Sequence, residues 1–150
     1  MSYDSYLDLF LDRKANSYVV ILRSLLNHGW SLNNTGGGIS YCLTDDNGQF
    51  NDLRTISFAE ENAMWTDIQR MEALNQLFGV NISWPRTDIA LITAWNNPAN
   101  PKQIDFMTQF QRPMLPGCEP ITNHNWYLEN LVPAINYTEN YVVGLRCHEE

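Results

Sequence analysis

Apolar residues recur at helical spacing near the start of the chain, at Leu7, Leu11, Tyr18, Leu22, Leu25 and Leu26. Ser17 is a residue type that caps the beginning of a helix, and Gly29 is a type that follows the end of one. The pattern therefore predicts an N-terminal helical segment, which Asn16 and Ser17 divide into two helices.

The spacing changes to two after the polar, glycine-rich stretch 31–38. Apolar and polar residues alternate at 39–44 and again at 53–58, on either side of Asn47-Gly48. Two alternating runs around such a dipeptide predict a β-hairpin.

Further elements follow in the second half of the chain. A helical stripe predicts a helix over 57–78, and alternation at Val80, Ile82 and Trp84 predicts a short strand that Pro85 stops. Residues 88–95 are apolar on both faces, as in a central strand. We also expect short helices over 102–110 and 123–132, the second broken by Pro133, and a last strand over 141–147.

Helices and strands are mixed without strict alternation. This order favours an α+β fold, with helices packed on a mostly antiparallel sheet of about five strands. The length of 150 residues predicts one globular domain spanning 1–150.

The charge balance narrows the classes of partner. Seventeen acidic residues against nine basic ones give a net charge of −8, which repels nucleic acid and favours basic partners or simply solubility. Residues 1–12 carry acids where a signal peptide carries bases, and no apolar run approaches the ~20 residues of a membrane span. The sequence predicts a cytoplasmic protein with no membrane or nucleic-acid partner.

The motifs that resemble catalytic or cofactor sites fail on inspection. Gly36-Gly37-Gly38 leads into a strand pattern with no lysine nearby, unlike a phosphate loop. A calcium loop around Gly48 would place Leu43 and Arg54 at ligand positions. A zinc site would need Cys118, His124, Cys147 and His148 to meet in space. We predict no cofactor, no metal and no catalytic residue.

Acidic side chains form two groups along the sequence. Asp4, Asp8 and Asp12 recur every four residues, so on a helix they line one face. The second group surrounds the hairpin turn and the start of the next helix, at Asp45, Asp46, Asp52, Glu60 and Glu61. Each group is either a solvated surface or a patch that meets a basic partner.

Tryptophan provides the other candidates for binding. Trp84 and Trp95 lie at the ends of predicted strands, where they would line a pocket or anchor an interface.

In its size, acidity and α+β pattern, and in these two acidic groups, the chain resembles bacterial immunity proteins of polymorphic and contact-dependent toxin systems. The resemblance implies a cytoplasmic inhibitor of a cognate toxin, and the acidic surface suits a basic, nuclease-type toxin. One alternative is a small-molecule enzyme or ligand-binding domain with a pocket lined by Trp84, Trp95, Tyr41 and Cys42 or His124. Another is an adaptor that forms homo-oligomers.

Overall fold

The computed structural model describes residues 5–15, 17–32, 37–44, 50–84, 90–108, 117 and 122–149. These residues form seven strands, three α-helices and one short 3-10 helix. The strands are β1 (Ser5–Leu11), β2 (Ile39–Thr44), β3 (Phe50–Ile56), β4 (Phe78–Trp84), β5 (Ala90–Trp95), β6 (Gln103–Thr108) and β7 (Val142–Glu149). The helices are α1 (Tyr18–Asn27), α2 (Glu61–Ala73) and α3 (His124–Asn136), and the 3-10 helix η1 (Phe58–Glu60) precedes α2.

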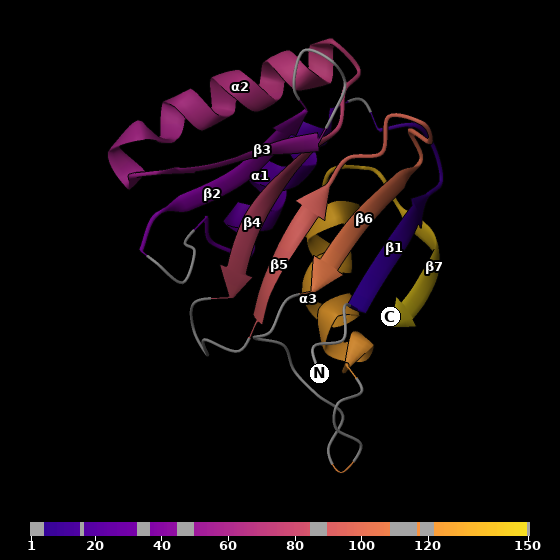
Figure 1. Ribbon diagram of the computed structural model, residues 1–150. Coiled ribbons are helices and arrows are strands. Elements are labelled where there is room, and N and C mark those ends of the chain that lie inside the picture. The colour runs from indigo at the N-terminus through magenta and orange to yellow at the C-terminus, as the bar shows by residue number, and fades with distance from the viewer. Residues whose placement is uncertain are drawn as a thin grey trace.

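All seven strands belong to one sheet in the order β3-β2-β4-β5-β6-β1-β7, and every neighbouring pair is antiparallel (Figure 1). β2 and β3 form the predicted hairpin, and β4, β5 and β6 follow one another as a meander. β1 lies between β6 and β7, so the first and last strands of the chain are hydrogen-bonded neighbours.

The helices cover one face of this sheet. Leu7, Leu9, Val80, Ile92 and Phe106 point toward them and are buried. α1 and α3 lie behind the sheet in Figure 1. α2 lies on the same side. Its Asp67 accepts a hydrogen bond of 2.8 Å from the hydroxyl of Tyr41, and Tyr41 is paired with Val80 across β2 and β4, so both side chains point to the same face of the sheet. The structure thus confirms an α+β fold with helices packed on an antiparallel sheet.

The beginning of α1 depends on two side chains. Ser17 is the N-cap residue, as predicted, and its hydroxyl accepts from the backbone N–H of Val20. The carboxylate of Glu72 in α2 accepts from the Ser17 hydroxyl at 3.1 Å and from the backbone N–H of Tyr18. A carboxylate at this end of a helix is stabilising because it faces the positive end of the helix dipole.

The prediction of a helix over the first residues is wrong, because residues 5–11 form β1. Leu7, Leu9 and Leu11 alternate with Asp8 and Phe10, so their spacing also fits a strand. A helix would have stacked the aspartates on adjacent turns, where like charges repel. In a strand, residues four apart are separated by about 13 Å, which relieves that repulsion.

Three other predictions need correction. Residues 103–108 form strand β6 and not a helix, since Ile104 and Phe106 alternate toward the core. α2 ends at Ala73 and not at Phe78, and Asn75 takes a positive φ of 54° just beyond it. α3 continues past Pro133, which lies on its exposed face, where water can satisfy the carbonyl group that the ring leaves unpaired. With β1 and β6 counted, the described sheet has seven strands where about five were expected.

In the part of the chain that the structure describes, none of the helices has the length and apolar character of a membrane span.

Candidate functional site

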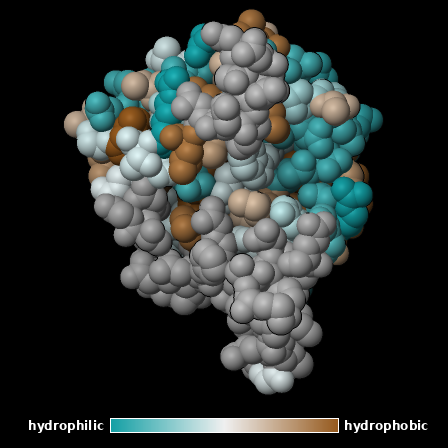
Figure 2. All heavy atoms as spheres, viewed as in Figure 1, coloured by the Kyte–Doolittle hydropathy of each residue, from teal (hydrophilic) through white to brown (hydrophobic). Residues whose placement is uncertain are grey.

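The sheet face opposite the helices carries a row of polar and aromatic side chains. Trp95 lies opposite Asp105, Asp105 opposite Asp8, and Asp8 opposite Arg146, so the row crosses β5, β6, β1 and β7. No helix in the described part of the chain covers this face. Figure 2 looks onto it and shows hydrophilic residues gathered over its β1–β7 side.

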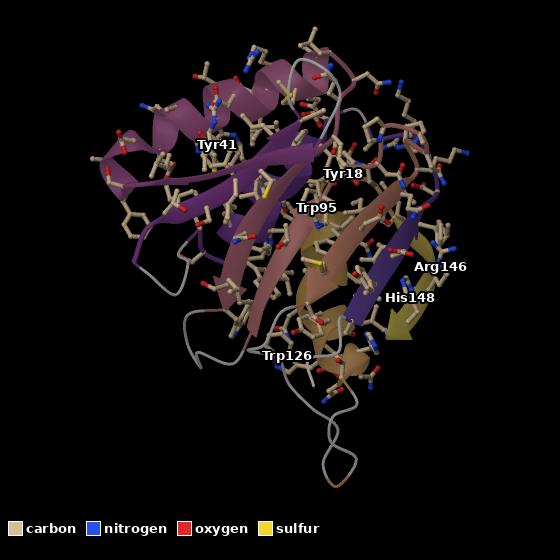
Figure 3. The ribbon with its side chains drawn as sticks, viewed as in Figure 1. Tyr18, Tyr41, Trp95, Trp126, Arg146 and His148 are labelled. Carbon is tan, nitrogen blue, oxygen red and sulfur yellow. The ribbon has the colours of Figure 1, made fainter. Side chains whose placement is uncertain are left out.

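An open cleft of about 540 Å³ lies along this row. Its lining residues are Tyr6, Asp8, Leu77, Trp95, Gln103, Asp105, Phe106, Met107, Arg146 and His148. Figure 3 shows Trp95 over the middle of the sheet and Arg146 and His148 along the β7 edge. The volume falls in the range of about 300–1,000 Å³ that is typical of ligand pockets.

Asp8 is a buried carboxylate that is held by one arginine. Its side chain is 6% exposed, and its Oδ2 accepts from Nε and Nη2 of Arg146 at 2.9 and 2.7 Å. The Arg146 guanidinium also lies over the ring of Phe10, 6.0 Å from its centroid. Burying a carboxylate without such a partner costs several kcal/mol, so the pairing with Arg146 offsets the cost of burying Asp8.

Asp105 faces Asp8 across the β1–β6 pair. Its Oδ1 accepts from the Gln103 side-chain amide at 2.6 Å, and its Oδ2 accepts from the Asn97 amide at 3.1 Å. Burial first, and then the hydrogen bond and the charge of Asp8, raise the pKa of Asp105 from 3.8 to about 6, against the lowering effect of the two amides. The site therefore combines an arginine-paired carboxylate with a neighbour that gains or loses its proton close to neutral pH.

Aromatic side chains form the walls of the cleft. Tyr6 and His148 stack with their ring centroids 4.8 Å apart. Trp95 lies flat against the backbone of Gly79, where an added Cβ would be only 2.3 Å from its Cε3 atom. The absence of a side chain at Gly79 thus leaves the space that the Trp95 ring occupies beside Asp105.

The described members of the two predicted acidic groups lie apart. Asp8 is in the cleft, whereas Asp12 is exposed at the end of β1 and accepts from the backbone N–H of Tyr141. Glu60 accepts from the N–H and hydroxyl of Ser57, and Glu61 accepts from the indole of Trp65. These glutamates follow β3, the far edge strand, about five strand spacings or 24 Å from β1.

The remaining members of the acidic groups cannot be placed. Asp4, Asp45 and Asp46 lie outside the described residues, and of Asp52 only the backbone in β3 is described. The prediction that the acidic side chains gather into one docking patch stays a prediction.

Trp84 and Trp95 do not share a site. Trp95 lines the cleft, but Trp84 points to the opposite face and packs edge-on against Trp30 and Trp126 at 5.3 and 5.8 Å. Of the other residues expected around a ligand pocket, Tyr41 faces the helices, and His124 lies beside Ser5. Cys42 lies in the same cross-strand row as Trp95, on the other side of Gly79, and does not line the cleft.

Among the residues that the structure describes, no group of three or more His, Cys, Asp or Glu side chains could hold a metal ion. Cys118 of the considered zinc set lies outside them. Cys147 and His148 are consecutive in β7 and point to opposite faces of the sheet, so they cannot ligate one ion together.

Sequence reasoning missed Asp105, Arg146 and Tyr6, and it considered His148 only as a zinc ligand. Asp105 was assigned to a helix, and Arg146 to a terminal strand with no known neighbour. Comparisons of the chain with protein-family models, curated proteins and solved structures return no match.

Proposed function

We propose that this chain is a cytoplasmic immunity protein that neutralises a cognate, basic toxin by binding it with the helix-free face of its sheet. The observation that carries the proposal is the pairing of Asp8 with Asp105 in an open cleft beside Trp95. Carboxylates complement a basic surface, and a partly exposed tryptophan supplies the aromatic anchor common at the centre of interfaces.

The overall charge supports the same proposal. At a net charge of −8, the protein attracts a basic partner over a distance of about one Debye length, or roughly 8 Å at physiological salt. Steering of this kind raises association rates and favours basic partners over acidic ones. A nuclease toxin is basic because it binds a polyanion, so its active-site surface is a suitable target.

Co-expression with the product of the adjacent open reading frame tests the proposal. We expect a stable complex on size-exclusion chromatography and protection of cells from that product. Asp105→Asn should weaken the complex at least tenfold, since losing one partner of a desolvated charge pair costs about 2–5 kcal/mol. Glu129→Gln is the matched control, because Glu129 is exposed on α3, on the other side of the sheet.

Two results would count against the proposal. If neither a complex nor protection is seen, the chain is not the inhibitor of that neighbour. If Asp105→Asn and Glu129→Gln weaken the complex equally, the cleft is not its docking site.

The same cleft favours a second candidate function, the binding or conversion of a small molecule. Its volume suits a metabolite, and a carboxyl whose pKa is raised to about 6 beside a second carboxylate is typical of acid–base sites. A thermal-shift screen with metabolites tests this candidate. A ligand that raises the melting temperature of the wild type by several degrees, but not that of Asp105→Asn, would favour it over toxin binding.

A further inference from the structure

Half of the cleft already holds an arginine side chain. Arg146 pairs with Asp8 and lies over the ring of Phe10, which is the usual way for a guanidinium to combine a carboxylate with an aromatic face. The other half presents the same two features, a carboxylate at Asp105 and an aromatic ring at Trp95, directly opposite each other across β5 and β6.

The charges in the cleft leave room for one more cation. Among the lining residues that the structure describes, Asp8 and Asp105 contribute two negative charges when both are ionised, and Arg146 contributes one positive charge. Asp105 accepts from the side-chain amides of Gln103 and Asn97, one at each oxygen, and the Asp8 carboxyl is its other hydrogen-bonding neighbour. A carboxylate can accept about four, so both oxygens keep acceptor capacity.

We propose that the cleft receives one arginine side chain of the partner protein, which pairs with Asp105 and stacks against Trp95. The identity of the partner rests on the proposed function, but the recognition of a guanidinium does not. Arginine suits the site better than lysine, because its planar head can hydrogen-bond a carboxylate while it lies on a ring.

Binding of the arginine is coupled to the loss of the proton from the Asp105 carboxyl. The titratable and charged groups of the described chain around Asp105 are Asp8 and Tyr6 from β1, Arg146 and His148 from β7, and Tyr18 from α1, and the amides of Gln103 and Asn97 donate to it. Because the pKa of Asp105 is raised to about 6, arginine must displace its proton below that pH and binds an ionised carboxylate above it. Affinity therefore rises with pH up to about 6 to 7 and then levels off.

The test uses N-acetyl-arginine methylamide as the probe and its citrulline analogue as the uncharged control. Each is titrated in the millimolar range into the full-length protein, and the Trp95 indole signal is followed by heteronuclear NMR. We expect a saturable shift with the arginine probe alone, and an affinity about tenfold weaker at pH 5.0 than at pH 7.5. Glu129→Gln should behave as wild type.

Asp105→Asn should lose both the binding and its pH dependence, and a spectrum as dispersed as that of wild type shows that the variant is folded. Trp95→Leu keeps the carboxylate and is followed through the side-chain amide signal of Gln103, which donates to Asp105. It should bind more weakly but keep the pH dependence. The inference is overturned if citrulline binds equally well, if the affinity is the same at both pH values, or if the indole does not respond.

The outcomes separate this inference from the proposed function. A toxin complex without arginine binding would mean that the partner docks without filling the cleft. Arginine binding without any toxin complex would leave the cleft a guanidinium site and remove the immunity role.

Discussion

Replacing Asp105 with asparagine is expected to change how the stability of the protein depends on pH. In the folded state the pKa of this carboxyl is raised from 3.8 to about 6, mainly by burial and then by Asp8. The folded protein therefore holds a proton between about pH 4 and 6 that the unfolded chain releases. Its stability falls as pH rises through that window and stays lowered above pH 6.

The magnitude follows from the two pKa values. A difference between 3.8 and about 6 corresponds to about 3 kcal/mol if the whole shift is expressed in stability. Asp105 is only partly buried, so solvent screens much of this, and we expect about 1 kcal/mol. Asparagine cannot ionise, so the variant is free of this pH-dependent loss of stability. It also weakens the hydrogen bond from Gln103 or Asn97, which lowers its stability by about 1 kcal/mol at every pH.

Urea unfolding at pH 4, 5, 6, 7 and 8 measures the effect. The stability of Asp105→Asn relative to wild type should be about 1 kcal/mol more favourable at pH 8 than at pH 4, with most of the change below pH 6. Asp12→Asn is the matched control, because Asp12 is exposed and asparagine can still accept from Tyr141. A constant difference between Asp105→Asn and wild type across this range would refute the reasoning about the carboxylate pair.

Three other substitutions test the packing around the site and the first helix. Glu72→Ala removes the carboxylate at the N-terminus of α1 and should cost about 1–2 kcal/mol in urea unfolding. Arg146→Gln leaves the buried carboxylate of Asp8 without its cation and should lower the free energy of unfolding by about 2 kcal/mol at pH 7. Gly79→Ala places a methyl group against the Trp95 ring and should lower stability by about 1–3 kcal/mol and alter the near-ultraviolet circular dichroism.

The sequence correctly predicts the elements whose apolar spacing fits a helix or a strand but not both. The β2–β3 hairpin, β4, β5 and the cap of α1 at Ser17 are confirmed. The prediction of a helix for the residues of β1 is wrong because Leu7 and Leu11 alone fit a helix, whereas Leu7, Leu9 and Leu11 together fit a strand. Only pairing with β6 and β7, which are remote in sequence, decides between the two.

The cleft was harder to predict than the elements that form it. Each of its charged residues lies between apolar neighbours in a strand, as Asp8 lies between Leu7 and Leu9 and Asp105 between Ile104 and Phe106. That pattern is a usable signal for a charge on the second face of a sheet. It does not give strand order, and Asp8 and Arg146 are 138 positions apart in the sequence.

The placement of β1 between β6 and β7 has a consequence for assembly of the sheet. Until β7 joins, β1 is an edge whose free backbone groups could pair with any extended segment, including one from another molecule. Asp8 discriminates among such segments, because a strand that brings no cation opposite it would bury the carboxylate unpaired. A shift of β7 by two residues would place Gly144 or His148 there in place of Arg146, so this ion pair selects both the correct strand and its correct alignment.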